Sequence, residues 1–280
     1  MATVIDGRMV AGEVLDGVAA EISKTGLKPR LAIVMVGNDP GSQIYVRLKE
    51  KACARVGIVS TNYFLPENTK QEELLKLVKK LNKGPDNGIL VQIPLPKHID
   101  PEVILEAVDP EKDIDGLTEQ NLGRLFFGTN PYPPCTPGGV LKLLDRYGVN
   151  IEGKDVVMVG RSKIVGKPIA MMLTNKNATV TLCHSKTRNL AGHARRAEIL
   201  VVAVGRPKMF TADMVREGAV VIDVGINRLD GKVVGDVDFE SVKGKASFIT
   251  PVPGGVGPMT IAMLMKNTLR ACQRQAKTKG

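Results

Sequence analysis

The sequence contains no tryptophan, and only 4% of its 280 residues are aromatic. Proteins that hold single-stranded nucleic acid stack the bases on aromatic side chains, so this composition argues against that class. Cysteine is also sparse: Cys53, Cys135, Cys183 and Cys272 are widely spaced and form no CxxC pair. The spacing predicts neither a metal site nor a disulfide framework, and we expect four reduced, buried thiols.

Long apolar runs are missing as well. The longest apolar run of strand character, Ile199 to Val204, is far too short to span a bilayer. Near the N-terminus, Asp6, Arg8 and Glu13 interrupt any stretch that resembles the apolar part of a signal peptide. We therefore expect a cytoplasmic protein without a membrane partner.

Charge of one sign is in excess, since 39 basic and 29 acidic residues leave a formal net charge of +10. Five basic residues and no acidic one lie in residues 266–280, namely Lys266, Arg270, Arg274, Lys277 and Lys279. Cations near a helix C-terminus complement the helix dipole, so the simplest interpretation is a solvated helix end. Nucleic-acid binding and long-range attraction of a polyanionic small substrate are alternatives that charge alone does not separate.

The chain is long enough for two domains at about 150 residues each. Short apolar runs of strand length alternate with segments of helical spacing along almost the whole sequence. The predicted strands form two series, Leu31–Val36, Val59–Leu65 and Gly88–Ile93, then Asp155–Val159, Ala178–Cys183, Ile199–Val204 and Ala219–Val224. Such alternation predicts βαβ units and parallel sheets that helices cover on both faces.

Helices and a domain boundary are predicted between these strands. Apolar spacing over Gly41–Val56 and Lys70–Leu81 indicates two helices, and Gly57 fits a helix C-cap. Between the two series, Gly128–Gly139 contains four prolines, which indicates turns and a domain boundary. The expected class is α/β, in two lobes.

The second series opens with a strand that runs into Gly160–Ser162 and then into a helix with Pro168 near its start. Such a turn directs the free amides of a helix start toward a phosphate. The motif is not a strict GxGxxG, because Ser162 occupies the place of the second glycine, and a glycine turn also occurs for structural reasons alone. The next strands end in Gly205–Pro207 and Gly225–Asn227, which suit a ligand crevice.

The end of the following strand distinguishes NAD from NADP. An NAD site usually places Asp or Glu about twenty residues beyond the first glycine, where it binds the ribose hydroxyls. Here that strand ends in Cys183–Thr187, which contains no acidic residue. A carboxylate would repel a 2′-phosphate, whereas Ser185 and Arg161 could bind one. The sequence therefore favours NADP.

The first series contains a candidate chemical site. Tyr45 and Lys49 lie four residues apart and share a helix face, although this spacing usually marks only a solvated surface. Gln92 follows a predicted strand, and a turn just beyond residue 110 contains Asp113 and Asp115, either of which could be a simple turn residue. The carboxyl ends of parallel strands are where α/β proteins bind ligands, so we treat these side chains as one candidate group.

A further segment, Thr250–Thr260, is rich in proline and glycine. Glycines let a backbone approach a flat ligand closely, and Pro258 fits the first turn of a following helix. We interpret the segment as a ligand-binding loop.

Taken together, these segments resemble the bifunctional methylenetetrahydrofolate dehydrogenase/methenyltetrahydrofolate cyclohydrolase family over nearly the whole chain. The resemblance rests on long motifs in the same order, Tyr45–Lys49, Val91–Pro96, Pro110–Thr118, Pro134–Pro137, Gly160–Pro168, Cys183–Thr187 and Pro251–Thr260. It implies an N-terminal α/β catalytic domain and a Rossmann-like NADP-binding domain, with the C-terminal helix returning to the first lobe. The implied boundaries are 1–139 plus 258–280 for the folate-binding catalytic domain and 140–257 for the NADP-binding domain.

The resemblance also implies an activity and its residues. It implies that NADP oxidises 5,10-methylenetetrahydrofolate to the methenyl form, which is then hydrolysed to 10-formyltetrahydrofolate, in a homodimer formed through the nucleotide lobe. The implied catalytic residues are Lys49, Gln92, Asp115 and Tyr45. A free or polyglutamylated folate would bind Tyr45, Lys49, Val91, Gln92, Ile93, Asp115, Pro253, Gly254, Gly255, Val256 and Gly257, and NADP would bind Gly160, Arg161, Ser162, Ser185 and Ile226.

Two alternatives stay open at this point. An NADP-dependent dehydrogenase of the shikimate type also has a substrate lobe before its nucleotide lobe. The other alternative is a nucleic-acid binder that uses the basic tail, although we expect no nucleic-acid partner.

Overall fold

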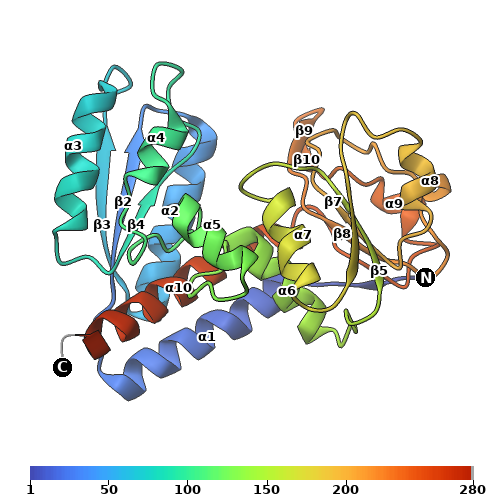
Figure 1. The fold of residues 1–280 in the computed structure, drawn as a ribbon, viewed down its shortest axis with the longest axis horizontal. Coiled ribbons are helices and arrows are strands. Elements are labelled where there is room, and N and C mark those ends of the chain that lie inside the picture. Colours follow the sequence, from blue (N-terminus) through green and yellow to red (C-terminus); the bar gives the residue numbers. More distant parts are fainter. Residues whose placement is uncertain (279–280) are drawn as a thin grey trace. The chain divides into compact units, whose positions relative to one another are not determined.

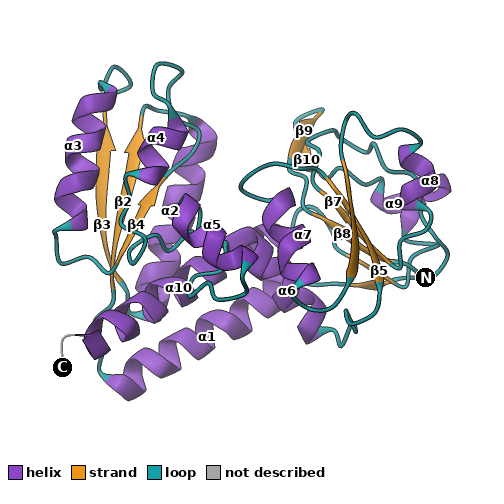
Figure 2. Cartoon of the chain, in the orientation of Figure 1, coloured by secondary structure: helices purple, strands orange, loops and turns teal. Residues whose placement is uncertain are grey.

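The computed structural model describes residues 1–278 and divides into two compact units (Figure 1). The three-stranded unit comprises Gly12–Cys135 and the C-terminal segment from Ile261, and the six-stranded unit comprises Met1–Ala11 and Thr136–Thr260. The chain passes from one unit to the other within α1 (Gly7–Thr25), at the start of α6 (Cys135–Arg146) and within α10 (Val256–Thr278). Both units are α/β, which confirms the predicted class (Figure 2).

The three-stranded unit is built on a parallel sheet of order β3-β2-β4. Its strands are β2 (Arg30–Val36), β3 (Val59–Leu65) and β4 (Gly88–Val91), and its helices include α2 (Pro40–Val56), α3 (Gln71–Asn82), α4 (Pro101–Glu106) and α5 (Glu119–Phe126). The central strand β2 is almost entirely buried, as expected for a parallel strand with both faces covered. On α3, Leu74, Val78 and Leu81 are buried at helical spacing and pack on this sheet. The predicted strands are confirmed, with β4 ending at Val91 rather than Ile93.

Helix α2 positions the candidate chemical residues and has clear ends. The Asp39 carboxylate accepts the backbone N–H of Ser42 at 2.7 Å, and Pro40 is compatible with the first helical turn. Gly57 ends the helix with φ +81°, which confirms the predicted glycine cap. The buried face of the helix carries Ser42, Val46, Lys49, Ala52, Cys53 and Val56. A lysine on that apolar face requires an explanation, because lysine is rarely buried without a partner.

The six-stranded unit contains a fully parallel sheet of order β1-β11-β8-β7-β5-β6. These strands are β1 (Thr3–Val4), β5 (Asp155–Val159), β6 (Thr179–Cys183), β7 (Ile199–Val202), β8 (Val220–Asp223) and β11 (Phe248–Ile249), and the helices include α7 (Gly166–Thr174), α8 (Leu190–Ala194) and α9 (Phe239–Val242). From β5 the chain adds β6 on one side and then β7 and β8 on the other. The strand order therefore reverses between β5 and β7, which creates a topological switch point.

Some elements differ from the prediction or were not predicted. The two-residue strands β1 and β11 and the hairpin of β9 (Asn227–Leu229) and β10 (Lys232–Val234) are too short to show periodicity. Because β1 pairs with β11, the first eleven residues lie in the six-stranded unit, and not with the other lobe as the family resemblance implies. Helix α6 begins at Cys135, inside the segment expected to consist of turns. A short 3-10 helix, Ala212–Met214, completes the second unit.

The cysteines and the basic C-terminal residues are placed as follows. All four cysteines are buried and unpaired, as predicted. Arg274 on α10 forms an ion pair with Glu111 at 3.4 Å and lies over the Tyr132 ring, so part of the expected solvated helix end makes contacts. Lys279 lies outside the described residues. Across residues 1–278, the helices are each too short or too polar to span a membrane.

Candidate active site and cofactor cavity

Lys49 and Gln92 form a buried pair in the three-stranded unit. Lys49 is only 8% exposed, and its Nζ donates a hydrogen bond of 2.7 Å to Oε1 of Gln92. Gln92 directly follows Val91, the last residue of β4, and its backbone N–H is bonded to the Val34 carbonyl of β2. Its Nε2 donates to the Ile93 carbonyl at 2.6 Å. The sheet and the following loop thus fix the Gln92 amide with its oxygen directed at the lysine.

Charge and burial act in opposite directions on Lys49. Burial lowers the pKa of its ammonium group, while the negative charge of Asp115 raises it, and burial is the larger effect. The pKa of the Asp115 carboxyl is raised by burial, against the opposing effects of Lys49 and of hydrogen bonds from Cys135. A lysine with a lowered pKa gives up and takes back a proton more readily near neutral pH than a solvated one.

The two aspartates of the turn after residue 110 make different contacts. The buried Asp113 carboxylate accepts the backbone N–H groups of Gly116 and Thr118, the Thr118 hydroxyl and the Asn121 amide, each at 2.9 Å. These bonds organise the turn. Asp115 makes different contacts: its negative charge raises the pKa of the Lys49 ammonium group, and it accepts hydrogen bonds from Cys135.

Cys135 was not among the predicted site residues, yet it lies against Asp115. Burial raises the pKa of this thiol, so it stays protonated and acts as a donor. Asn267 of α10 donates to the Ile114 carbonyl at 2.9 Å and to the Pro133 carbonyl at 2.8 Å, which ties together the segments that precede Asp115 and Cys135. Cys135 lies in the motif Pro134–Pro137, but no local pattern links it to Asn267, which lies 132 residues further along the chain.

Tyr45 lies one helical turn before Lys49, as the spacing predicted. The side chain is half-buried, and burial raises the pKa of its hydroxyl. An aromatic ring with one covered and one accessible part is suited to pack against a flat ligand. The three-stranded unit therefore contains all four predicted catalytic residues, on α2, after β4 and in the following turn.

A cavity of about 220 Å³ lies at the carboxyl edge of the six-stranded sheet. It is lined by residues that follow three adjacent strands, namely Gly160 and Arg161 after β5, His184 and Ser185 after β6, and Ala203, Val204 and Arg206 after β7. This is the switch point between β5 and β7, where α/β folds bind nucleotides. Two of the lining residues are arginines and none is acidic, so the cavity suits a phosphate group. Arg161 and Ser185 thus lie together as predicted.

Close backbone approach requires the glycines of the nucleotide motif. Gly160 has φ +118°, and a Cβ there would lie 2.1 Å from the Ala203 carbonyl oxygen. A Cβ on Gly166 would lie 2.0 Å from the Gly160 carbonyl oxygen, so the start of α7 packs directly on the turn. The Ser162 hydroxyl accepts the N–H groups of Val165 and Gly166 at 3.2 and 3.3 Å. The serine in the second glycine position therefore caps the start of the helix.

The predicted ligand loop 253–257 lies in the six-stranded unit and leads into α10, where Pro258 is the third residue. Two of its glycines have different structural reasons. A Cβ on Gly255 would lie 2.6 Å from the Pro251 carbonyl oxygen, and Gly254 has φ +110°, a conformation that favours glycine. A Cβ on Gly257 would lie 4.0 Å from Cδ1 of Ile226. Ile226, a predicted NADP residue, therefore lies next to the end of this loop, and its side chain is 54% exposed.

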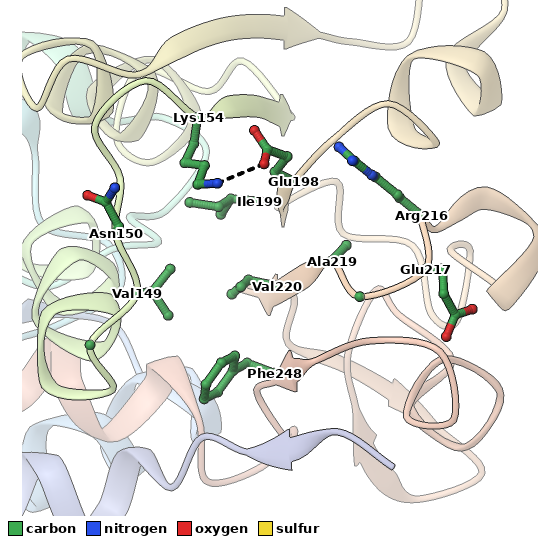
Figure 3. Close-up of a pocket in the computed structure, with 12 residues that line it drawn as sticks. Val149, Asn150, Lys154, Glu198, Ile199, Arg216, Glu217, Ala219, Val220 and Phe248 are labelled. Atoms are coloured by element: carbon green, nitrogen blue, oxygen red, sulfur yellow. Dashed lines mark hydrogen bonds and ion pairs between the residues drawn. The ribbon is translucent and has the colours of Figure 1, made fainter.

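A second cavity, of about 330 Å³, lies at the opposite edge of the same sheet (Figure 3). Its lining residues lie before the strands or at their first residues. Lys154 precedes β5 and Glu198 precedes β7, and these two form an ion pair of 2.9 Å. Ligands of α/β folds bind at the carboxyl ends of strands, which argues against this cavity as the cofactor site. Within residues 1–278, no group of three or more His, Cys, Asp or Glu is arranged to hold a metal ion.

Comparison with known proteins identifies the family. The catalytic-domain model of tetrahydrofolate dehydrogenase/cyclohydrolase matches residues 5–115, and the NAD(P)-binding-domain model of the same family matches residues 134–276. The bifunctional protein FolD of Moorella thermoacetica is 55% identical over 278 residues, which cover 98% of this chain and 99% of that protein.

Solved structures agree in sequence and in fold. The bifunctional FolD of Campylobacter jejuni is 47% identical with a TM-score of 0.95, covering 98% of this chain and 100% of that one. The Trypanosoma brucei FolD, solved in complex with NADP cofactor and inhibitor, is 41% identical with a TM-score of 0.94, and 99% of each chain is covered. The predicted resemblance is confirmed, and the chain belongs to the tetrahydrofolate dehydrogenase/cyclohydrolase family.

Proposed function

We propose that this protein oxidises 5,10-methylenetetrahydrofolate to 5,10-methenyltetrahydrofolate with NADP and hydrolyses the product to 10-formyltetrahydrofolate. The observation that carries the proposal is the buried Lys49–Gln92 pair next to Asp115, in a chain of this family. Positioning suffices for the first reaction, whereas the second needs a group that moves protons. The six-stranded unit supplies the cavity that positions the cofactor, and the three-stranded unit supplies Lys49, the group that moves protons.

The oxidation removes hydride from the one-carbon bridge between two nitrogens. The lone pairs of the flanking nitrogens stabilise the resulting cation, so no proton transfer at carbon is required and orientation dominates the rate. NADP, when bound, accepts the hydride. We assign its binding to Gly160, Arg161, Ser162, Ser185 and Ile226, supported by the acid-free, arginine-containing cavity at the switch point.

The hydrolysis adds water to the methenyl carbon. The added water loses one proton and leaves a hydroxyl group on the former methenyl carbon. That hydroxyl loses its second proton as the carbonyl forms and the carbon–nitrogen bond breaks, the departing nitrogen takes up one proton, and one proton is released to solvent overall. Lys49, with its lowered pKa, takes the first proton as a neutral amine and returns one to the departing nitrogen. The cationic substrate itself favours the neutral amine. Gln92 orients the lysine through the 2.7 Å hydrogen bond.

The remaining assignments complete the proposal. Asp115 binds the pterin ring, Tyr45 stacks on the aminobenzoate portion, and Val91, Ile93 and residues 253–257 contact the folate. Folate binding is otherwise assigned to the three-stranded unit and NADP binding to the six-stranded unit, in a cytoplasmic homodimer that accepts polyglutamylated folates.

Two separate assays test the proposal. In the first, the protein is mixed with 5,10-methylenetetrahydrofolate and either NADP or NAD, with shikimate as the alternative substrate. Reduction of NADP with the folate alone supports the dehydrogenase, and reduction with shikimate contradicts it. In the second, 5,10-methenyltetrahydrofolate is supplied directly, without nucleotide. Decay no faster than in buffer contradicts the cyclohydrolase.

A further inference from the structure

Asp236 is a buried carboxylate at the carboxyl edge of the six-stranded sheet. It is 0% exposed, and each of its two oxygens accepts two N–H groups. Oδ2 accepts the backbone N–H groups of Val204 and Gly205 at 2.6 and 3.0 Å, and Oδ1 accepts those of the Arg206 backbone and the Asn227 side chain at 2.8 and 2.9 Å. Three successive backbone amides thus point at one carboxylate, which sets the path of the loop 204–206.

This loop belongs to the cavity at the switch point. Val204 and Arg206 line that cavity together with Gly160, Arg161 and Ser185. The loop begins after Ala203, whose N–H makes the last bond to the neighbouring strand β5 through the Val159 carbonyl. Successive N–H groups in such a loop need acceptors, and the buried carboxylate supplies them from a segment about thirty residues away.

A second buried carboxylate holds the backbone of Asp236. Oδ1 of Asp223 accepts the N–H groups of Gly225 and Asp236 at 2.9 and 3.0 Å, and Oδ2 accepts that of Val237 at 2.9 Å. A Cβ on Gly225 would lie 2.3 Å from Cγ of Asp236, and one on Gly235 would lie 1.8 Å from Oδ2 of Asp223. Both positions therefore require glycine, because any side chain there would overlap a carboxylate.

We propose that Asp236 is a positioning residue for NADP: its carboxylate holds the loop 204–206 in the conformation that forms the cofactor cavity, and Asp223 fixes the backbone of Asp236. The inference rests on the proposed function, because the cavity is assigned to NADP there. Asp236 does not line the cavity and acts through the loop.

Replacement of Asp236 by asparagine separates positioning from charge. Either orientation of an asparagine amide places an NH₂ group against two N–H donors, so the loop must move. Loss of one negative charge near the cavity, by contrast, strengthens the binding of an anionic cofactor. The two effects have opposite signs.

The matched control is Asp238→Asn. Asp238 lies two residues further along the same segment, is only partly buried and makes no side-chain cap to α9. The variant removes the same charge without removing acceptors from the loop. A difference between the two variants therefore reports the hydrogen bonds of Asp236.

The test is calorimetric titration of the full chain with NADP in the absence of folate. We expect Asp236→Asn to weaken NADP binding about tenfold or more, since several hydrogen bonds to a charged group are lost. We expect Asp238→Asn to leave the affinity unchanged or slightly raised. Hydrogen exchange of the amides of residues 204–206 should accelerate in Asp236→Asn alone. Hydrolysis of directly supplied methenyltetrahydrofolate should be unchanged, because none of the four groups bonded to the Asp236 carboxylate belongs to a residue assigned to folate.

The outcomes separate the inference from the function on which it rests. A wild-type protein that does not bind NADP contradicts the proposed function. A wild type that binds NADP while Asp236→Asn binds it equally, with unchanged exchange at residues 204–206, overturns the inference. If Asp236→Asn does not fold, hydrogen exchange of the wild type decides the matter. Amides of residues 204–206 that are protected before NADP is added support the inference, because they then already donate to the buried carboxylate. Amides that exchange as fast as those of an exposed loop until NADP binds overturn it.

Discussion

Replacement of Lys49 by methionine should separate the two reactions. Methionine keeps an unbranched chain of similar size on the buried face of α2 but has no group that carries a proton. Hydride transfer, which depends on orientation, should lose little activity. Hydrolysis should lose most of its rate, because the group that takes and returns the proton is absent.

The size of the effect follows from the site. A positioned acid–base group contributes about 100- to 10,000-fold, which corresponds to roughly 3–5 kcal/mol of activation free energy. Folding stability should change far less. The variant leaves the Gln92 Oε1 without its 2.7 Å donor, at a cost of about 1–3 kcal/mol, but it also removes the desolvation of an ammonium group that is only 8% exposed.

The assay follows both reactions for the wild type, Lys49→Met and the control Lys51→Met. Lys51 is exposed on the same helix, so this control removes a charge without touching the buried pair. Dehydrogenase activity near the wild-type level with hydrolysis reduced at least a hundredfold, about the lower bound for an acid–base group, is expected for Lys49→Met. Equal loss of both activities, or hydrolysis at the wild-type rate, would refute the role assigned to the lysine.

Three further predictions follow from the six-stranded unit. Ser185→Asp places a carboxylate at the cavity and should weaken NADP binding much more than NAD binding, and an unchanged ratio of the two dissociation constants would contradict the assigned 2′-phosphate position. Gly160→Ala should destabilise the fold by about 2–4 kcal/mol and abolish NADP binding, because its Cβ would lie 2.1 Å from a carbonyl oxygen at φ +118°. The control Gly218→Ala, which meets no atom within 4 Å at φ +74°, should cost only about 1 kcal/mol in denaturant unfolding, and equal losses would contradict the steric argument. Burial raises the pKa of Asp223 from 3.8 to about 6 in the folded state, so its ionisation opposes folding. Its contribution to the free energy of unfolding is present below pH 4 and is lost as the pH rises through 6. Over that interval the free energy of unfolding of the wild type should fall by about 3 kcal/mol relative to that of Asp223→Asn. Parallel curves of unfolding free energy against pH for the two proteins would exclude this linkage.

Most of the fold was readable from the sequence because the longer strands are short apolar runs bounded by turn residues. Strands β3 and β5 have the predicted bounds, and α2 ends at the predicted Gly57. The two-residue strands β1 and β11 pair with each other across most of the chain. Neither has enough residues to show alternation, so the position of the N-terminal strand could not be predicted.

The candidate site was partly readable for a similar reason. Tyr45 and Lys49 share a helix face through local spacing, and Gln92 marks a strand end. Asp113 and Asp115 are chemically identical residues of one turn. Only the hydrogen bonds that Asp113 accepts show that it stabilises the turn. Local spacing cannot distinguish such residues.

The long-range polar contacts could not be predicted from the sequence. Asp236 binds amides that are 30 to 32 residues away, and Asn267 reaches the Ile114 carbonyl across 153 residues. No periodicity or capping rule connects residues at such separations.

One chain that carries out both reactions should show them together, and a single time course is the decisive experiment. The wild-type protein is mixed with 5,10-methylenetetrahydrofolate and NADP, and NADPH and the methenyl compound are followed in the same sample. We expect NADPH to form with little accumulation of the methenyl compound above its uncatalysed steady level. Accumulation of the methenyl compound in step with NADPH would mean that the Lys49 site does not hydrolyse it, and no reduction of NADP would contradict the dehydrogenase as well.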